Sequence, residues 1–298
     1  MKILITGACG WLARALVTEL EKANHEMRLL DRIDPSQATI FVAGQLERQV
    51  SPLKTSWPFI KAELLDFAAI KSAAEGMDAI VHLAAIPTGL PEQGSAIMQA
   101  NVTGTYHILD SARIHGLSRV VVASSINAFG TIYWRISGRP VTYPSMPLTE
   151  EFPPEPEDPY SLSKWFDEEI CNAFTRAYGI KTAALRFAAV QSAEGLEQMR
   201  KNAGPTTQWN NDLYQWVHVD DVATGIRQAI ECPTLPPSGA YTLGAADTRC
   251  PEPTMELLKK FQPVLAENIT QPLPGRTALM SITKARKAFG YNPAHSFF

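Results

Sequence analysis

A glycine-rich turn near the N-terminus constrains the fold more than any other feature of the sequence. Ile3-Leu4-Ile5 is typical of a short buried strand, and the pattern Gly7-x-x-Gly10-x-x-Ala13 follows it and leads into a helix expected to end near Lys22. Small residues let the backbone turn tightly and approach a ligand, and the N–H groups at a helix N-terminus favour a phosphate. The turn predicts a βα unit that holds a dinucleotide pyrophosphate, although an ordinary strand-to-helix turn shares the pattern.

The remaining pattern predicts an α/β fold. Further strands are expected at residues 27–31, 79–83, 119–123, 181–187 and 240–243, a short one at 40–42, and helices over 95–115 and 283–289. Continuous apolar strands separated by helices indicate a parallel sheet covered on both faces. We therefore expect a Rossmann-type doubly wound domain over 1–187, with a return segment near 216–232, and a smaller C-terminal substrate lobe over 188–298. Two long connections, 33–57 and the proline-rich 131–159, interrupt the pattern, and the second is expected to border the active site.

Composition excludes several classes of function. The net charge of −3 carries no basic patch for nucleic acid, and no apolar run approaches the ~18 residues of a membrane span. The four cysteines lack close spacing and the six histidines form no H-x-x-x-H pattern, so no metal site is expected. Reduced cysteines, and a strand that begins directly after Met1, predict a cytoplasmic protein.

Tyr160-Ser-Leu-Ser-Lys164 places a phenol and an ammonium four residues apart, on one face of a helix. A free tyrosine ionises near pH ~10, and a neighbouring cation favours the phenolate, so such a pair suits general acid–base chemistry near neutral pH. Asp31, at the end of the second strand, can accept hydrogen bonds from ribose hydroxyls and would repel a 2′-phosphate. NAD is therefore expected rather than NADP, although Arg32 keeps NADP as an alternative.

With these motifs the chain resembles the extended short-chain dehydrogenase/reductases, the NAD-dependent epimerase/dehydratase group. The resemblance covers nearly the whole chain, and its further motifs are Asp66, His82-Leu83-Ala84-Ala85, Asn101-Val102-x-Gly104-Thr105, Ser124-Ser125, Leu185-Arg186 and Val217-His218-Val219-Asp220-Asp221-Val222. It implies roles for matching residues. The pyrophosphate would lie against Gly7, Gly10, Trp11 and Leu12, the adenosine ribose against Asp31 and Arg32, the adenine near Asp66 and Phe67, and the middle of the cofactor against Leu83, Ala84, Ala85 and Asn101. Tyr160 would be the acid/base, Lys164 would hold the nicotinamide ribose, and Ser125, with Ser124 as the alternative, would bind the substrate oxygen.

The substrate region departs from the pattern of nucleotide-sugar enzymes. Ala189 stands where those proteins usually have an asparagine, and the segment from Val190 to Trp216 is short. Both features favour a smaller polyol, sugar or sugar acid, and in this respect the chain is similar to uronate dehydrogenases. Arg186 could then pair with a substrate carboxylate in a bidentate fork. Thr88 and Asn127 are further candidate substrate contacts.

Three functions remain open at this stage: a dehydrogenase of a small sugar-like alcohol, a nucleotide-sugar epimerase or dehydratase that keeps NAD bound, and a non-catalytic NAD-sensing regulator. The family resemblance also suggests a homodimer. His82 and His218 are interpreted as hydrogen-bonded structural residues, and Asp220-Asp221 as a helix cap rather than a metal ligand. The aromatic residues Trp209, Tyr214 and Trp216 are expected either to stack on a sugar or to pack within the lobe.

Overall fold

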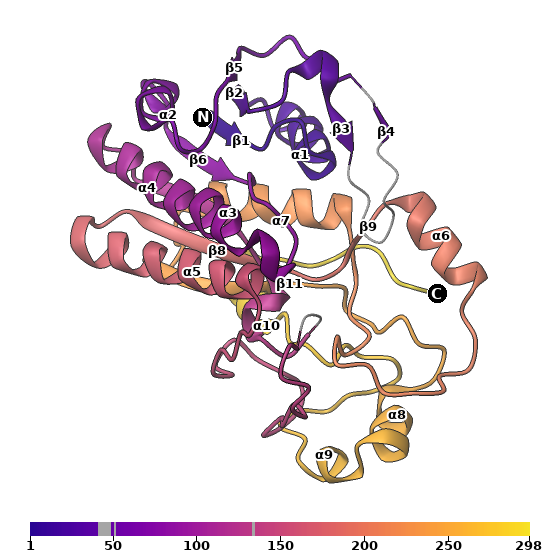
Figure 1. Cartoon of the computed structure of the whole chain (residues 1–298). Helices are drawn as coiled ribbons and strands as arrows, with labels where there is room; N and C mark the ends of the chain where they lie inside the picture. The colour runs from indigo at the N-terminus through magenta and orange to yellow at the C-terminus, as the bar shows by residue number, and fades with distance from the viewer. Residues whose placement is uncertain (41–48, 51, 133–134) are drawn as a thin grey trace.

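The computed structural model describes residues 1–40, 49–50, 52–132 and 135–298 (Figure 1). Within these residues the main element is a seven-stranded parallel sheet of order β11-β8-β7-β6-β1-β2-β5. Its strands are β1 (Lys2–Thr6), β2 (Glu26–Asp31), β5 (Phe59–Lys61), β6 (Ala79–His82), β7 (Arg119–Ser125), β8 (Lys181–Phe187) and β11 (Ser238–Leu243). The chain order reverses between β1 and β6, which is the switch point where doubly wound sheets bind ligands. The predicted fold class is confirmed.

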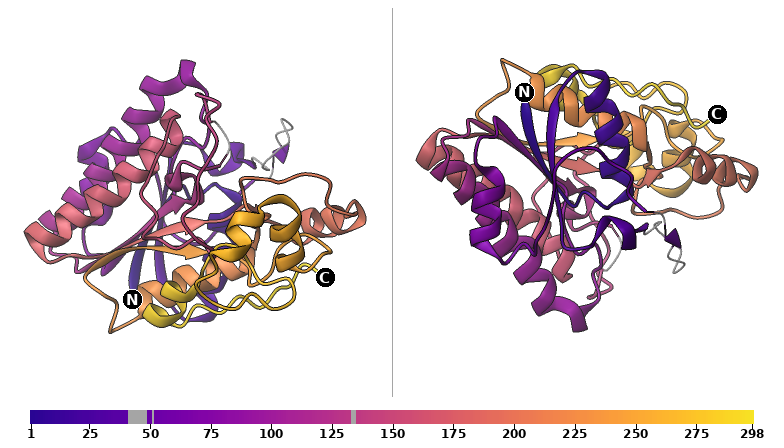
Figure 2. Two further views of the ribbon diagram at one scale, coloured as in Figure 1. Left: turned by 90° about the horizontal axis from the view of Figure 1, so that it is seen from below. Right: turned by 90° about the horizontal axis from the view of Figure 1, so that it is seen from above.

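Helices cover both faces of the sheet (Figure 2). On one side lie α1 (Trp11–Lys22) and α7 (Val219–Glu231), and on the other lie α2 (Phe67–Ala74), α4 (Gly104–Ile114) and α5 (Pro159–Tyr178). Successive side chains of a strand point to opposite faces. Ile3 and Ile5 accordingly enter the apolar core with Leu16 of α1, whereas Leu4 enters the other core with Ile108 of α4. Both faces are buried, which is why the strands are continuously apolar instead of alternating.

The predicted helix over 95–115 is present but contains a widened turn. It runs through α3 (Gly94–Ile97), a π-helical turn η3 (Met98–Thr103) and α4, while the short helix η2 (Pro91–Gln93) precedes it. Such π turns are frequent at functional sites. Other short helices are η1 (Pro35–Gln37) and η4 (Ile126–Phe129).

The smaller lobe gathers segments from distant parts of the chain. It contains α6 (Ala193–Lys201), α8 (Thr254–Phe261) and α9 (Pro263–Glu267), and the proline-rich segment joins it through Met146 N to Asn268 O, 3.0 Å, and Leu148 N to Leu279 O, 2.8 Å. A two-stranded pair, β9 (Val190–Gln191) and β10 (Val217–His218), lies where the lobe meets α7. In the described part of the chain, no helix is both long and apolar enough to cross a bilayer.

The sheet continues beyond the predicted return segment, and one predicted strand is only partly described. The return to the sheet does not end at 232, because β11 pairs along β8 and α10 (Thr283–Phe289) packs on it through Phe289 and Tyr241, whose ring centroids are 5.3 Å apart. Of the predicted strand 40–42, Ile40 belongs to β3 (Thr39–Ile40), which pairs with β4 (Gln49–Val50), and Phe41 and Val42 lie outside the described residues.

Candidate active site

The glycine turn brings β1 against the segment that follows β6. Gly7 has a φ of +71°, and a Cβ built on it would lie 2.7 Å from Ala84 N, so a side chain has no room there. Gly10 N donates to Gly7 O at 3.0 Å and closes the turn. Because Gly10 is the N-cap of α1 and offers no side chain, the first N–H groups of the helix have no side-chain cap. The turn therefore has the form that a pyrophosphate requires.

Asp31 joins the turn from the end of β2. Its Oδ2 accepts from Cys9 N at 2.9 Å and its Oδ1 from Ile33 N at 3.0 Å, so the carboxylate is held in place by backbone on both sides. Burial, with Asp31 as the next cause, raises the pKa of the Cys9 thiol to about 12, so Cys9 stays protonated inside the turn. Arg32 is exposed.

The predicted adenine contacts follow β5, the next strand of the sheet. Asp66 caps α2 by accepting from Ala69 N at 3.0 Å, and the ring of Phe67 lies 5.0 Å from that of His107 on α4. Both residues therefore stand at the same carboxyl-terminal edge of the sheet as Asp31. They follow β5, the strand next to β2 at the margin of the sheet.

Asn101 connects the segment after β6 to α5. It is fully buried in the π turn, where its Oδ1 accepts from Ile86 N at 2.8 Å and its Nδ2 donates to Ser163 Oγ at 2.9 Å. These bonds fix the position of Leu83, Ala84 and Ala85 relative to the helix that carries Tyr160 and Lys164. Asn101 is thus a structural link, and its amide is already occupied by protein partners.

Helix α5 presents the tyrosine and lysine at its first two turns. Asp158 is its N-cap and accepts from Ser161 N at 2.9 Å, which fixes where the helix begins. Lys164 is buried; its Nζ donates to Ala123 O at 2.8 Å and to Asp167 Oδ2 at 3.1 Å, and lies 5.9 Å from the ring centroid of Tyr160. Burial acts to lower the pKa of the lysine, but Asp167 and Tyr160 outweigh it and raise that pKa, so the ammonium stays charged.

The two serines at the end of β7 face opposite ways. Ser124 is buried and donates to Glu168 Oε1 at 2.6 Å, so its hydroxyl belongs to the core. Ser125 is half-buried and accepts from Asn127 N at 3.1 Å. Ser125 is two residues after Ala123, whose carbonyl binds Lys164, so the side chains of Ser125 and Ala123 lie on the same face of β7. This arrangement favours Ser125 over Ser124 as the substrate contact.

The sequence suggested a bidentate pairing of Arg186 with a substrate carboxylate, but two of its three nitrogens already donate to Glu168. Arg186 is 2% exposed, and its Nε and Nη2 donate to the two carboxylate oxygens of Glu168, each at 2.8 Å. Its guanidinium also lies over the ring of Phe129 at 4.2 Å. Glu168, four residues after Lys164, already occupies the bidentate fork, because a buried cation requires a buried counter-charge. Arg186 therefore connects β8 to α5 through Glu168.

Three buried polar atoms near this edge have no hydrogen-bond partner among the described residues: His82 Nε2, Asn127 Oδ1 and Arg186 Nη1. They come from the ends of β6 and β8 and from the turn after β7. Since buried polar atoms are normally hydrogen-bonded, a polar ligand at this edge would supply missing partners. His82 itself is hydrogen-bonded through Nδ1 to Thr6 Oγ1 at 2.6 Å, and burial, with Lys164 next, lowers its pKa to about 3.

The other candidates from the sequence lie in the segment after β6 and in the lobe. Thr88 is half-buried and accepts from Leu90 N at 3.4 Å. Trp216 is fully buried and donates to Asp247 O at 3.1 Å, and the Tyr214 hydroxyl donates to Gln208 O at 2.8 Å, so both pack within the lobe. Trp209 packs edge-on against Tyr214.

The expected cap of α7 is a different residue. His218 is the N-cap and accepts from Asp220 N at 3.3 Å, whereas Asp220 and Asp221 lie in the first turn, where they favour the helix dipole. Sequence reasoning also missed Asp167 and Glu168. Their positions three and four residues after Lys164 could have indicated that they share its helix face.

The sequence model of the NAD dependent epimerase/dehydratase family matches residues 3–244 of this chain. The chain belongs to this family. The predicted family is thereby confirmed, and so are the classification as an enzyme and the choice of NAD as cofactor.

Members of the family with different activities are similar to this chain. A uronate dehydrogenase from Pseudomonas putida is 27% identical over 83% of this chain and 77% of its own length. A UDP-glucose 4-epimerase from Bacillus subtilis is 25% identical over 98% of this chain and 92% of its own. A short-chain dehydrogenase/reductase from Agrobacterium tumefaciens, solved with bound NAD, superimposes with a TM-score of 0.70 at 22% identity, covering 100% of this chain and 94% of that one.

Proposed function

We propose that this protein is an NAD-dependent dehydrogenase that oxidises a secondary alcohol of a small sugar, polyol or sugar acid. One observation carries the proposal: Lys164, one helical turn from Tyr160, is bound to the backbone of β7 two residues before Ser125. The three residues of the predicted acid–base site are thereby gathered at the carboxyl-terminal edge of the sheet. The same edge carries the glycine turn at the switch point between β1 and β6.

The described residues fit NAD. At Gly7 the backbone is not covered by a side chain, because a Cβ there would collide with Ala84. Helix α1 begins without a side-chain cap, so its first N–H groups are available to a ligand. The proposed contacts with the pyrophosphate are Gly7, Gly10, Trp11 and Leu12, and those with the adenosine are Asp31, Arg32, Asp66 and Phe67. Those with the middle of the cofactor are Leu83, Ala84 and Ala85, and Asn101, predicted to border it as well, would act there by holding the neighbouring Ile86. The chemistry that NAD would supply here is acceptance of the hydride from the alcohol carbon.

The protein's own residues handle the proton. Tyr160 takes the proton from the substrate hydroxyl, and the ammonium of Lys164 lies 5.9 Å from the centroid of its ring. Asp167 holds Lys164 in position, because their atoms are 3.1 Å apart in the core. Ser125 orients the substrate oxygen, and Asn127, whose Oδ1 is without a partner in the described structure, offers an acceptor to a neighbouring hydroxyl.

A small substrate is favoured by the lobe. Between β9 and β10 the chain forms only the short helix α6 and irregular structure within the described residues, and Ala189 precedes β9 directly. The uronate dehydrogenase relatives support a sugar acid. Since Nε and Nη2 of Arg186 are paired with Glu168 and only Nη1 has no partner in the described structure, Arg186 cannot hold a substrate carboxylate in a bidentate fork, so neutral sugars and polyols are equal candidates.

The test is NADH formation with a panel of aldoses, polyols, uronic acids and nucleotide sugars, each with NAD and with NADP. Tyr160→Phe provides the inactive control. NADH accumulation with a free sugar, polyol or uronic acid, abolished by the substitution, supports the proposal. NADH formation only with nucleotide sugars, or none with any compound, contradicts it.

A nucleotide-sugar epimerase is the second candidate, because the B. subtilis epimerase aligns with nearly the whole chain. Conversion of a nucleotide sugar to its epimer without net NADH would establish this alternative. NAD binding without turnover of any compound in the panel would instead support the NAD-sensing regulator.

A homodimer through α4 and α5 is also proposed. Tyr106 on α4 and Tyr178 on α5 are 51% and 55% exposed, and large exposed apolar groups on adjacent helices are typical of interfaces. Light scattering that gives a monomer mass would contradict this assembly. The unpaired state of Cys9, Cys171, Cys232 and Cys250 supports a cytoplasmic location, which expression of a fluorescent fusion would test.

A further inference from the structure

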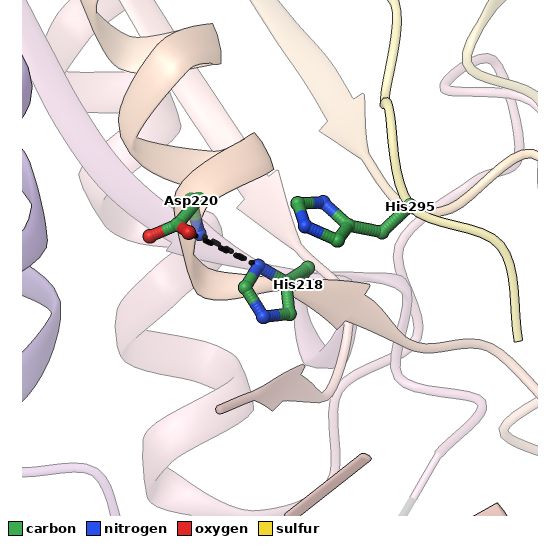
Figure 3. A group of neighbouring side chains, drawn as sticks. All are labelled: His218, Asp220 and His295. Carbon is green, nitrogen blue, oxygen red and sulfur yellow. Dashed lines mark hydrogen bonds and ion pairs between the residues drawn. The ribbon is translucent and has the colours of Figure 1, made fainter. Parts of the chain in front are cut away.

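We propose that His218, Asp220 and His295 form a binding site for a transition-metal ion, with Zn²⁺ as the expected cation (Figure 3). One candidate ligand atom from each residue lies within 4.8 Å of the other two. Two imidazoles and a carboxylate are ligands that Zn²⁺ prefers. The site lies where the C-terminal segment crosses the start of α7, and it is independent of the proposed dehydrogenase activity.

The backbone fixes the three residues by different means. His218 ends β10, is buried and caps α7, so its ring has a defined position. Asp220 is in the first turn of α7. The C-terminal segment is held by Asp221, whose carboxylate accepts from Ala294 N at 2.9 Å and from His295 N at 3.2 Å. His295 consequently lies on His218, with ring centroids 3.8 Å apart and an interplanar angle of 23° (Figure 3).

One pair of ligand atoms already has nearly the spacing of a metal site. Bond lengths of about 2.0–2.1 Å place the ligand atoms of a tetrahedral Zn²⁺ roughly 3.4 Å apart. His218 Nδ1 and Asp220 Oδ2 are already 3.6 Å apart. The adjustment falls on the side chains of Asp220 and His295, which are 67% and 38% exposed, while the buried ring of His218 keeps its place. Binding would replace the contact of His218 Nδ1 with Asp220 N.

An outer carboxylate lies beside the second histidine. His295 Nδ1 is 3.1 Å from Asp221 Oδ1, within ion-pair distance but without the geometry of a hydrogen bond. The opposite ring nitrogen, Nε2, is the one left to bind the ion. Metal-binding histidines commonly have a carboxylate at the nitrogen that does not bind the metal, and this partner strengthens the ligand. Asp221 therefore anchors the C-terminal segment and, when the ion is bound, would offer a carboxylate to the ring of His295.

The surrounding charges favour a dication. Asp220, Asp221 and Glu194 are acidic, and the neighbouring cation Arg200 donates to Ser296 O at 2.6 Å. A bound ion would fasten the C-terminal segment, whose Phe297 is buried against Trp216 of the lobe.

The site is tested by titrating chelator-treated protein with Zn²⁺ in a calorimeter, without NAD or sugar. Cys232, a half-buried thiol, is changed to serine in every variant so that Zn²⁺ cannot bind there. We expect one Zn²⁺ per chain, an affinity at least about tenfold lower in His295→Ala and in Asp220→Asn, and no change in His115→Ala, a histidine outside the cluster. Added Co²⁺ should give the visible absorption of a tetrahedral ion, and Mg²⁺ should not compete, because it prefers oxygen ligands.

Two results would overturn the site: no Zn²⁺ bound by the parent protein, or equal affinity in His295→Ala, Asp220→Asn and His115→Ala. Both substituted ligands are partly exposed, so correct folding of the variants can be verified by their unchanged circular dichroism. Because no cofactor or substrate is present, the outcome is distinguishable from a failure of the proposed activity.

Discussion

Replacement of Gly7 by alanine tests how closely the glycine turn approaches the segment after β6. The new Cβ would lie 2.7 Å from Ala84 N and 2.9 Å from Ala84 Cα, and these backbone atoms cannot rotate away. Gly76 offers a matched control, because it has the same φ of +71° and its Cβ would meet no described atom within 4 Å. Gly76→Ala therefore introduces the conformational strain alone, and Gly7→Ala introduces the strain together with the collision.

The two costs can be separated. A left-handed conformation costs a residue other than glycine about 1–2 kcal/mol. To restore an ordinary contact, the Gly7 turn and the Ala84 segment must separate by about 0.7 Å, and forced overpacking of this kind costs about 1–3 kcal/mol more. We expect the free energy of unfolding to fall by about 1–2 kcal/mol in Gly76→Ala and by about 2–5 kcal/mol in Gly7→Ala.

Urea unfolding of both variants measures this difference, and calorimetric titration with NAD measures its effect on the site. Gly7→Ala should weaken NAD binding because the turn must open, while Gly76→Ala should leave the affinity unchanged. Equal destabilisation by the two substitutions, together with unaltered NAD binding in Gly7→Ala, would refute the close approach of the turn to Ala84.

Three further predictions concern the site. Tyr160→Phe should reduce turnover by about 10²–10⁴-fold and leave the Kd for NAD unchanged; steady-state rates equal to those of the parent enzyme would exclude the tyrosine as acid/base. Asp31→Ala removes the acceptor of two backbone N–H groups, so the free energy of unfolding measured in urea should fall by about 1–3 kcal/mol. Titrations with NAD and NADP should show a reduced preference for NAD, and a retained preference would contradict the proposed ribose contact. The pKa of His82 is about 3 in the folded protein and ~6.5 in the unfolded chain. As the pH falls below ~6.5, only the unfolded chain binds a proton at this imidazole, so the free energy of unfolding declines by about 2 kcal/mol by pH ~5. In His82→Gln the difference in unfolding free energy between pH ~7 and ~5 should shrink by about that amount, and an unchanged difference would show that the histidine already takes up the proton when folded.

The sequence alone was sufficient for features that depend on neighbouring residues. The helix from Trp11 to Lys22 could be predicted because the small residues of the glycine turn are followed directly by apolar residues at helical spacing. The four-residue spacing of Tyr160 and Lys164 similarly determines their common face once the segment is helical. Asp31 could be located because β2 ends directly at it.

Tertiary structure decided the features that depend on contacts between distant segments. Arg186 is paired with Glu168, and Ser124 with the same carboxylate, only because β7 and β8 lie beside each other under α5. His295 reaches His218 because Asp221 binds the C-terminal backbone. Spacing along the chain could not reveal these pairs, since the partner of a buried charge is chosen by the packing of elements and not by local periodicity.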